Sequence, residues 1–332
     1  MKLKLTYAIS VVRCTIMKLI SQWKQIIFLL QFGIICWLIY LKYDSNETIN
    51  LQFFYEANPV SKRIPNFTLT PPLKCDGEDH FLVILVATRP NEGEARRAIR
   101  VTWGQKRTWL GKNVLTLFLI GKDGERWNPG KQSIEEEYVQ YGDIIRQNFI
   151  ESYNNLTLKT IMGFQWISEF CPNAEYVMKV DSDVFVNVKY LVNFLLKTNK
   201  IISEFFTGLP FINTKPHRGF VAKAYISTTD YPFSVYPPYC SGLGYVFSGE
   251  LSLKIYEMMG HVKPVKFEDV FVGICLKLLG VKLHIPDKEL FFIQKPKFDK
   301  CLYSRLIAVH GVSPWQLTKY WEDLRDLEIS SC

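Results

Sequence analysis

The sequence lacks the loop patterns that mark three common enzyme classes. A P-loop of the form Gly-x-x-x-x-Gly-Lys-Ser/Thr, a Gly-x-Gly-x-x-Gly dinucleotide loop and a Gly-x-Ser-x-Gly nucleophile elbow are all absent from its 332 residues. It also lacks Cys-x-x-Cys pairs, any His and Cys spacing typical of zinc, internal repeats and low-complexity tracts. P-loop kinases, dehydrogenases, serine hydrolases and zinc modules are therefore not indicated.

Acidic residues are missing from the first 42 positions, which hold six Lys or Arg. The net charge of +8 is concentrated there, because the remaining residues carry 34 basic and 32 acidic side chains. A protein that binds nucleic acid needs a basic face on its folded domain. The sequence therefore predicts no nucleic-acid partner.

One long apolar run lies near the N-terminus, between Lys24 and Lys42. Residues 25–41 hold only two strongly polar side chains, both glutamines, and are just long enough to span a membrane. Most of the flanking positive charge precedes the run, which predicts a cytosolic N-terminus. A cleaved signal peptide is the alternative, but no small-residue cleavage pattern follows and the basic leader is long.

The expected organisation has four parts: a cytosolic tail at residues 1–24, a transmembrane signal-anchor at 25–41, a proline-containing luminal stem at 42–73 and one folded domain at 74–332. Six cysteines beyond the anchor can form three disulfide bonds in an oxidising compartment. They are Cys75, Cys171, Cys240, Cys275, Cys301 and Cys332. Glycosylation sequons at Asn46, Asn66 and Asn155 fit the same side of the membrane.

The folded domain alternates between apolar strand patterns and amphipathic helix patterns, which predicts an α/β fold with a mostly parallel sheet flanked by helices. The expected strands are Phe81–Ala87, Val114–Ile120, Ile144–Ile145 and Tyr176–Val180. The expected helices are Glu94–Trp103, ended by Gly104, together with Ser133–Tyr141 and Thr157–Phe170.

The most informative stretch is Asp181-Ser182-Asp183, which follows a buried strand directly. Ligands of open α/β sheets bind at the carboxyl ends of the strands. Two carboxylates there suit Mg²⁺ or Mn²⁺, whose coordination is completed by water and nucleotide phosphates. The alternative is ordinary turn chemistry, in which the short polar side chains bond to nearby backbone amides.

Two later segments have a functional and a structural interpretation each. Glu268 and Asp269 open an apolar helical run, where acids are favoured by the helix dipole but can also provide a general base. Residues 236–245 combine aromatics with glycines, which is typical of a loop that stacks on sugars or of a tight turn held by a disulfide.

Taken in order, several segments resemble the β-1,3-galactosyltransferase family of Golgi type II membrane enzymes, which have a GT-A fold. Residues 256–264 are similar to the members that transfer N-acetylgalactosamine in globoside synthesis. Val180 stands where Thr is common in the family, a conservative departure that leaves the carboxylates intact. The segments that carry the resemblance are residues 97–104, 153–160, 181–183, 240–245 and 268–270.

The resemblance implies a UDP-sugar donor and a Mn²⁺ (or Mg²⁺) ion held by Asp183, Asp181 and His310, with Ser182 close to the nucleotide. It implies Asp269 as the general base, with Glu268 beside it orienting donor or acceptor. Arg97 and Arg100, three positions apart on one helix, are candidates to hold the phosphates. The structural alternatives are a packed histidine at position 310 and arginines that pair with acids of the domain.

The expected activity is inverting β-1,3 transfer of N-acetylgalactosamine, or galactose, from UDP-GalNAc or UDP-Gal to the terminal sugar of a glycan on lipid or protein, at the luminal side of the Golgi membrane. A galactosyltransferase acting on terminal N-acetylglucosamine is the first alternative. A glycoside hydrolase also uses paired carboxylates. A luminal glycan-binding protein without catalysis is the alternative from another class.

Overall fold

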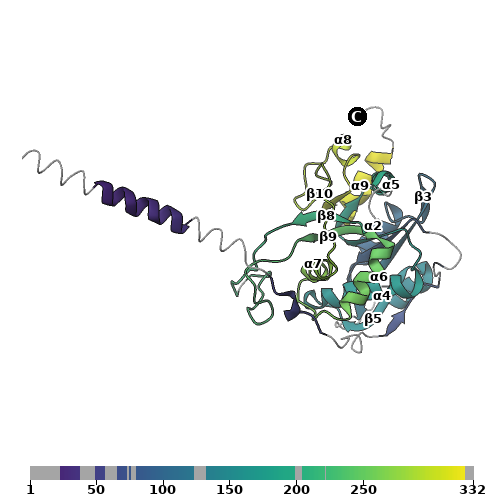
Figure 1. Ribbon diagram of the computed structural model, residues 1–332. Coiled ribbons are helices and arrows are strands. Elements are labelled where there is room, and N and C mark those ends of the chain that lie inside the picture. Colours follow the sequence, from purple (N-terminus) through teal and green to yellow (C-terminus); the bar gives the residue numbers. More distant parts are fainter. Residues whose placement is uncertain are drawn as a thin grey trace, which may run out of the picture. The chain divides into compact units, whose positions relative to one another are not determined.

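The computed structural model describes residues 23–37, 49–56, 66–72, 75, 80–122, 132–198, 204–220 and 222–325 (Figure 1). The chain divides into two compact units, Met1–Ile49 and Asn50–Cys332. In the first unit residues 23–37 are helical with exposed side chains. Among the described residues no helix combines the length and the apolar character needed to cross a membrane. The predicted anchor at 25–41 extends beyond this helix into residues that are not described, so it stays a prediction.

The second unit is built on an eight-stranded sheet in which β5, β4, β2 and β6 run parallel to one another. Antiparallel strands flank this centre: β1 pairs with β5, β3 with β4, and β9 joins β6 to β8. The α/β class is confirmed, but the sheet is mixed rather than mostly parallel. The strands are β1 (Phe67–Leu69), β2 (Leu82–Ala87), β3 (Arg107–Trp109), β4 (Lys112–Lys122), β5 (Ile144–Ile150), β6 (Tyr176–Asp181), β8 (Phe206–Phe211) and β9 (Tyr239–Ser248).

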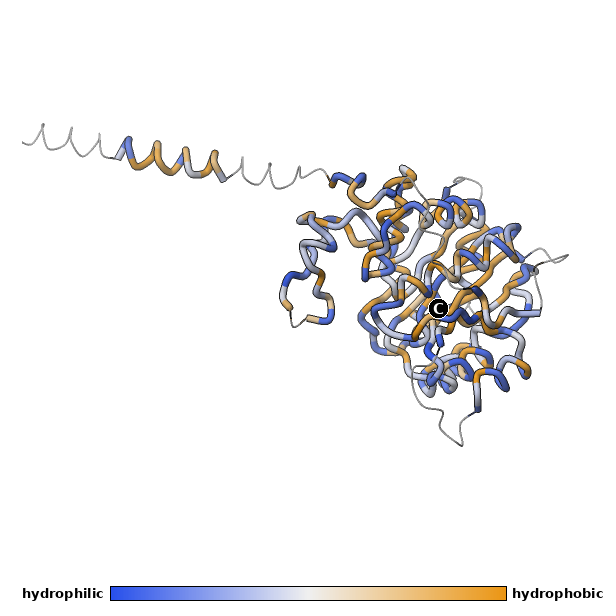
Figure 2. The backbone as a smooth tube through the Cα atoms, turned by 90° about the horizontal axis from the view of Figure 1, so that it is seen from below, coloured by the Kyte–Doolittle hydropathy of each residue, from blue (hydrophilic) through white to orange (hydrophobic). Residues whose placement is uncertain are grey.

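Strand β2 shows why the centre of the sheet is covered on both faces. All six of its residues are apolar and buried. Leu82, Ile84 and Val86 belong to one hydrophobic core, whereas Val83 and Leu85 belong to the other. Successive strand residues point to opposite faces, so a continuous apolar run needs a layer of packing partners on each side. Figure 2 shows the apolar segments gathered in the interior of this unit.

Three helices pack on one face of the sheet and three contribute to the core on the other. The first group is α4 (Leu156–Phe170), α6 (Gly249–Met259) and α7 (Glu268–Leu278). The second is α2 (Gly93–Val101), α5 (Val188–Thr198) and α9 (Pro314–Arg325). The shorter helices are α3 (Ile134–Tyr141), α8 (Lys300–Tyr303), η1 (Leu51–Phe53) and η3 (Tyr153–Asn155).

A second sheet of three strands lies beside the carboxyl end of β6 and decides the geometry of the site. It consists of β10 (Phe291–Phe292), β11 (Ala308–His310) and β7 (Val184–Val186), in that order. Strand β7 starts one residue after Asp183 and pairs antiparallel with β11, so that Val184 faces His310. The chain therefore brings a C-terminal histidine to the acidic turn through backbone pairing.

The folded unit begins well before the predicted boundary at residue 74. Phe54 is fully buried in one core, and the backbone of residues 54–56 hydrogen-bonds to His261 and Lys263. Strand β1 then joins the edge of the large sheet through β5. The described residues 50–56 and 66–72 of the predicted stem are thus part of the folded unit. The prolines of the predicted stem indicated an extended backbone, and an extended backbone can also pack against a folded domain.

Helix α2 ends earlier than predicted, at Val101. Gly104, which was expected to end the helix, has a different role. Its backbone N–H donates to the carbonyl of Ile99 at 2.9 Å, but its φ is not positive. A Cβ at this position would lie 2.6 Å from the Ile99 side chain. Glycine is required here by close packing and not by the left-handed conformation that ends many helices.

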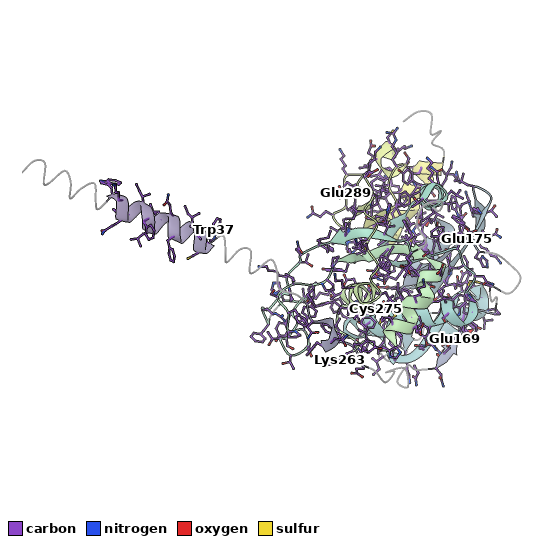
Figure 3. All side chains as sticks on the ribbon, viewed as in Figure 1. Trp37, Glu169, Glu175, Lys263, Cys275 and Glu289 are labelled. Carbon is purple, nitrogen blue, oxygen red and sulfur yellow. A yellow bond between two sulfur atoms is a disulfide. The ribbon has the colours of Figure 1, made fainter. Side chains whose placement is uncertain are left out.

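The cysteines do not form the three disulfide bonds that the sequence allowed. Cys75 bonds to Cys171, and Cys301 is also in a disulfide bond. Cys240 and Cys275 are buried and free, so the prediction is wrong for these two. Cys275 lies on α7 (Figure 3), inside the apolar core, where a thiol packs as a small hydrophobic group.

Replacing Phe54 tests whether the segment before residue 74 belongs to the fold. Phe54→Ala should lower the free energy of unfolding by about 3–5 kcal/mol, because it leaves a cavity where a fully buried ring stood. Phe53→Ala is the control, since that neighbouring ring is 44% exposed. Denaturant unfolding measures both. Equal small losses for the two variants would contradict the boundary at Asn50.

Candidate active site

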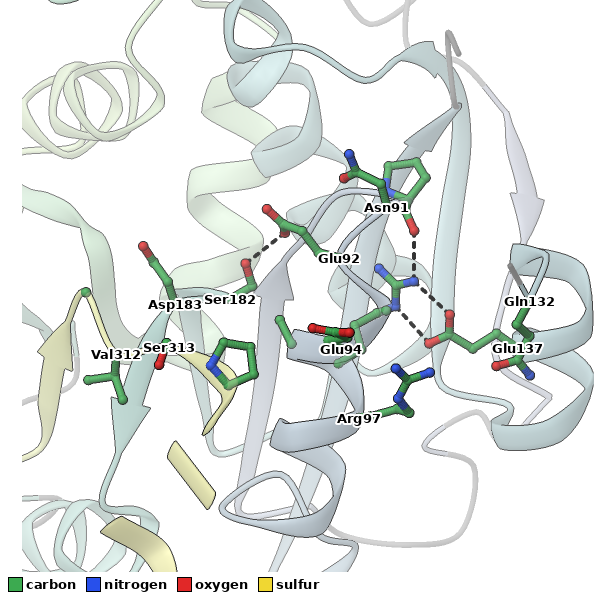
Figure 4. A pocket seen from close by; sticks show the side chains of 16 residues that line it. Asn91, Glu92, Glu94, Arg97, Gln132, Glu137, Ser182, Asp183, Val312 and Ser313 are labelled. Atoms are coloured by element: carbon green, nitrogen blue, oxygen red, sulfur yellow. Dashed lines mark hydrogen bonds and ion pairs between the residues drawn. The ribbon is translucent and has the colours of Figure 1, made fainter. Parts of the chain in front are cut away.

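A cavity of about 840 Å³ opens at the carboxyl edge of the sheet (Figure 4). Four segments line it: the loop and first turn of α2, Gln132 and Glu137 at α3, the turn after β6, and the residues that lead into α9. Its lining includes Glu92, Glu94, Arg97, Ser182, Asp183 and Ser313. The predicted acidic turn therefore faces a cavity large enough for a nucleotide-sized ligand.

Asp183 and His310 meet at the edge of this cavity. The Nε2 atom of His310 lies 3.3 Å from Oδ2 of Asp183, and both side chains keep access to solvent. The contact lowers the pKa of Asp183 and raises the pKa of His310, because each charged form stabilises the other. The pairing of β7 with β11 holds them together, and the Val312 N–H also donates to the Asp183 carbonyl at 2.8 Å.

Asp181 and Ser182 are already engaged with protein groups. Oδ1 of Asp181 accepts a 2.7 Å hydrogen bond from Nζ of Lys179. Burial raises the pKa of Asp181, although the charge of Lys179 opposes this shift. The Ser182 hydroxyl donates to Glu92 at 2.9 Å, so the turn is tied to the loop before α2 (Figure 4).

Lys179 is the centre of a buried network that extends beneath the cavity. Besides Asp181, its ammonium group donates to the Gly242 carbonyl at 2.7 Å and to Oε1 of Glu268 at 2.8 Å. Burial acts to lower the pKa of Lys179, but the two carboxylates outweigh it and the pKa is raised. Lys179 and Asp181 are two positions apart on β6, so both project from the same face of the strand.

Glu268 is buried, and both of its carboxylate oxygens accept hydrogen bonds. Oε1 accepts from Lys179, while Oε2 accepts from the hydroxyls of Tyr245 at 2.9 Å and Thr160 at 3.1 Å. A carboxylate held in this way fixes α7 against β6, β9 and α4. Three of its about four acceptor sites are occupied by protein donors, which makes it a positioning group in this structure.

Asp269 has a different environment from its neighbour. It is half-buried, and its carboxylate accepts from the Gly242 N–H at 3.2 Å and from the Val270 N–H at 2.8 Å. Withdrawal from water, and next the charge of Glu268, raise the pKa of Asp269 to about 7. Gly242 must be glycine, because a Cβ there would lie 2.7 Å from Oε1 of Glu268.

The two arginines predicted to hold phosphates have separate roles. Arg97 is exposed at the cavity and forms no hydrogen bond or ion pair with any described residue. Arg100 bonds to Asp143 at 2.7 and 2.8 Å and to Glu137 at 2.7 Å, which is the structural alternative given for it. Arg100 shares its helix face with Arg96, four positions earlier, which is also bound to Glu137.

The described residues contain no group of three or more His, Cys, Asp or Glu side chains arranged to hold a metal ion. Only Asp183 and His310 of the three predicted ligands are in contact, because Asp181 is bonded to Lys179. A carboxylate and an imidazole are still suitable donors for Mn²⁺, which takes remaining ligands from water and phosphate. The pair therefore fits a divalent ion that is held jointly with a nucleotide.

Sequence reasoning missed several residues that build the site. Lys179 is the one polar side chain inside a buried strand, and that exception was a usable signal. Arg96 supports the loop before α2 by donating to the Thr88 side chain and to the carbonyls of Arg89 and Pro90. Nothing in the local sequence distinguishes Arg96 from its neighbour Arg97. Tyr245 belongs to β9, which was expected to be a loop.

Residues 236–245 satisfy neither of their two predicted interpretations. From Tyr239 they form β9, paired on both sides, and Tyr245 is fully buried with its hydroxyl bonded to Glu268. Cys240 is free, so no disulfide holds this segment. The glycines serve the close approach of β9 to Glu268 and β6, and the aromatic rings are core residues.

Comparisons with known proteins agree with this geometry. The Galactosyltransferase family model matches residues 94–287, which include the acidic turn and the start of α7. The chain belongs to this family. UDP-GalNAc:beta-1,3-N-acetylgalactosaminyltransferase 1 of Rattus norvegicus is 53% identical over 296 residues, 89% of each chain.

Two further comparisons give the range of similarity. Beta-1,3-galactosyltransferase 5 of Homo sapiens is 39% identical over 307 residues, 92% of this chain and 96% of that protein. A galactosyltransferase solved with donor and acceptor sugar analogues is 11% identical, with a TM-score of 0.39 over 75% of this chain and 98% of its own. Similarity in sequence is thus much higher to the curated relatives than to this solved structure.

Removing the ammonium group of Lys179 should destabilise the domain. Lys179→Met leaves Asp181 and Glu268 without their shared cation, and we expect the free energy of unfolding to fall by about 3–5 kcal/mol. Lys277→Met, at an exposed position of α7, is the matched control. Thermal or denaturant unfolding at pH 7 gives both values. A loss below about 1 kcal/mol for Lys179→Met would show that the network is not needed for stability.

Proposed function

We propose that this protein is an inverting β-1,3-glycosyltransferase of the GT-A type. It transfers N-acetylgalactosamine, or galactose, from a UDP-sugar to the terminal sugar of a glycan on a lipid or a protein. The observation that carries the proposal is Asp269, a carboxyl group with a pKa of about 7. It follows Glu268, which Lys179 links to Asp181 of the acidic turn. The names of the curated relatives support the reaction class and the donor.

The cavity beside the acidic turn is the proposed donor site. Among its lining residues Arg96 and Glu137 neutralise each other, which leaves Glu92, Glu94 and Asp183 against Arg97. A diphosphate alone would meet excess negative charge there. A nucleotide that arrives with a divalent cation would not, and Arg97 is free to contact a phosphate oxygen.

Asp183 and His310 are the proposed protein ligands of a Mn²⁺ or Mg²⁺ ion. Bound there, the ion would neutralise charge on the leaving UDP. His310 must be neutral to coordinate, so its raised pKa makes metal affinity fall as the pH falls. The hydrogen bond from Lys179 to Asp181 assigns Asp181 to holding the turn, with any contact to the ion through water.

Asp269 is the proposed general base. The acceptor hydroxyl oxygen attacks the anomeric carbon as the bond from that carbon to the UDP oxygen breaks, and the proton passes to Asp269. UDP leaves with the bonding electrons, and one displacement inverts the anomeric centre. A base with a pKa near the working pH is both ionised and able to accept the proton. Glu268 positions Asp269 through α7 and does not itself contact the reacting atoms.

We propose a Golgi location with the folded unit in the lumen, held by the predicted anchor at residues 25–41. The charge asymmetry of the first 42 residues supports this orientation. The second candidate activity is galactose transfer to terminal N-acetylglucosamine, which the 39% identity to a beta-1,3-galactosyltransferase keeps open.

The deciding experiment gives the protein Mn²⁺, either UDP-GalNAc or UDP-Gal, and acceptors that end in galactose or N-acetylglucosamine. A β-1,3-linked product from one donor establishes the reaction and chooses between the two activities. Hydrolysis of a glycan without nucleotide would establish the glycosidase instead. Glycan binding without transfer from either donor would identify a binding protein.

Asp183→Ala should remove the metal-dependent step. We expect transfer to fall by at least about 100-fold, because the ion would lose its carboxylate ligand. Chelation of the metal should have the same effect on the wild type and little further effect on the variant. Asp287→Ala, at an exposed position, is the control. Transfer that remains metal-dependent at full rate in Asp183→Ala would overturn the metal assignment.

Transfer should depend on the ionisation of Asp269. Because only the carboxylate can take a proton, kcat/KM at saturating Mn²⁺ should rise as the pH increases through about 7 and level off above it. Asp269→Asn should lose about 10²–10⁴-fold in transfer and still bind UDP. Isothermal titration with UDP separates the two effects. An unchanged rate in the variant would exclude Asp269 as the base.

A further inference from the structure

The chain between β8 and β9 forms a long connection that one arginine organises. We call its described residues, 212–220 and 222–235, the Phe220 loop. Arg218 donates to the carbonyls of Ile226 and Ser227, both at 2.9 Å, and to those of Tyr231 at 2.7 Å and Phe233 at 3.0 Å. Four charge-assisted bonds from one side chain give this loop a defined shape without regular secondary structure.

The loop presents large apolar groups to solvent. Phe220 is 83% exposed, and its ring lies 4.9 Å from that of Tyr225. Ile212, at the start of the loop, is half exposed. Lys215 and Lys223 belong to the same segment. Aromatic rings next to lysines are the composition of protein surfaces that rest in the interface of a lipid bilayer.

The loop also borders the side of the site where the proposed base Asp269 lies, which we take as the acceptor site. The Lys223 ammonium lies 4.5 Å from the ring centre of Tyr153, and Lys266 donates to the carbonyls of Lys223 and Tyr225. Tyr153 has its pKa raised first by burial and then by the charges of Asp269, Asp181 and Glu268, which shows that it lies near the acids of the site. The loop therefore connects the site to an exposed apolar tip.

The other end of the loop contacts the place where the chain enters the folded unit. Phe54 stacks on Tyr231 at 5.4 Å, and Phe53 lies 6.0 Å from Phe233. Arg218 binds the carbonyls of both loop residues. The chain that leads back to the apolar N-terminal segment thus leaves the unit beside the Phe220 loop.

We propose that the Phe220 loop is a membrane-contacting surface that inserts Phe220 into the lipid interface, so that the site reaches the sugar of a membrane glycolipid. The inference rests on the proposed function, because it assumes a glycosyltransferase. A lipid surface is favoured over a protein partner for two reasons. This one loop carries the exposed apolar tip, and it contacts both the segment that leads toward the predicted anchor and the acceptor side of the site. The chemistry it requires is an uncharged or zwitterionic bilayer with which aromatic groups partition.

The test uses the full chain in phosphatidylcholine vesicles that contain a neutral glycolipid ending in galactose, and a soluble oligosaccharide with the same terminal sugar. Phe220→Asp should lower transfer to the vesicle glycolipid about tenfold, the loss expected when one phenylalanine is kept out of an apolar phase. Transfer to the soluble oligosaccharide should be unchanged. Val139→Asp is the control, since Val139 is also 83% exposed but lies on α3, near the other edge of the sheet.

A second measurement needs no sugar. Brominated phospholipid should quench the added indole of Phe220→Trp more than that of Val139→Trp, and Phe220→Trp should keep full transfer to the glycolipid. Equal loss of both activities in Phe220→Asp would mean contact with the acceptor sugar and would overturn the proposal, as would no loss in either or no difference in quenching. Failure of the wild type to use any acceptor would count against the proposed function, while the quenching still reports on the membrane contact.

Discussion

The hydrogen bonds of the Lys179 ammonium are the interaction on which the rest of the site depends. One cation joins the end of β6 through Asp181, β9 through Gly242 and α7 through Glu268. A buried lysine is tolerated only when carboxylates compensate it, and carboxylates this close are tolerated only with the cation. Removal of Lys179 would leave two carboxylates without their shared cation, so this one side chain holds the three elements in one arrangement.

This network explains why two neighbouring acids behave so differently. Glu268 accepts hydrogen bonds from Lys179, Tyr245 and Thr160, so it is fixed within the protein. Asp269 receives backbone N–H groups but no cation of its own, and the charge of Glu268 adds to its withdrawal from water. A base poised near neutrality is thus a consequence first of burial and then of the structural carboxylate beside it.

The groups proposed to bind the donor and the groups proposed to act on the acceptor are held by different structural elements. The donor cavity is built from the first turn of α2, part of α3, the acidic turn and the chain before α9. The second sheet brings His310 to its edge. The base and the Phe220 loop are held by α7, β9 and Lys266. Because β6 carries both Lys179 and Asp181, it is the common element, and a shift in this strand would move donor and acceptor groups together.

Much of this arrangement could be predicted from residue order alone. The continuous apolar run of β2 and the strand before Asp181 determined a buried sheet with an acidic carboxyl edge, because such runs must be covered on both faces. The helices α3, α4 and α7 began within one residue of their predicted starts, because caps and periodicity are local signals. Asp183 and His310 were predicted by resemblance as ligands of the same metal ion, and the two side chains lie in contact.

Contacts between distant segments were decided only by the tertiary structure. Arg97 and Arg100 follow the same local pattern, yet Glu137 and Asp143 neutralise Arg100 and leave Arg97 at the cavity. Tyr245 was expected in a loop, but it pairs with β6 on one side and with β8 on the other. Local sequence determines which side chains can do chemistry. Which of them remain free to do it depends on charges and strands supplied from elsewhere in the chain, and these are fixed only when the chain has packed.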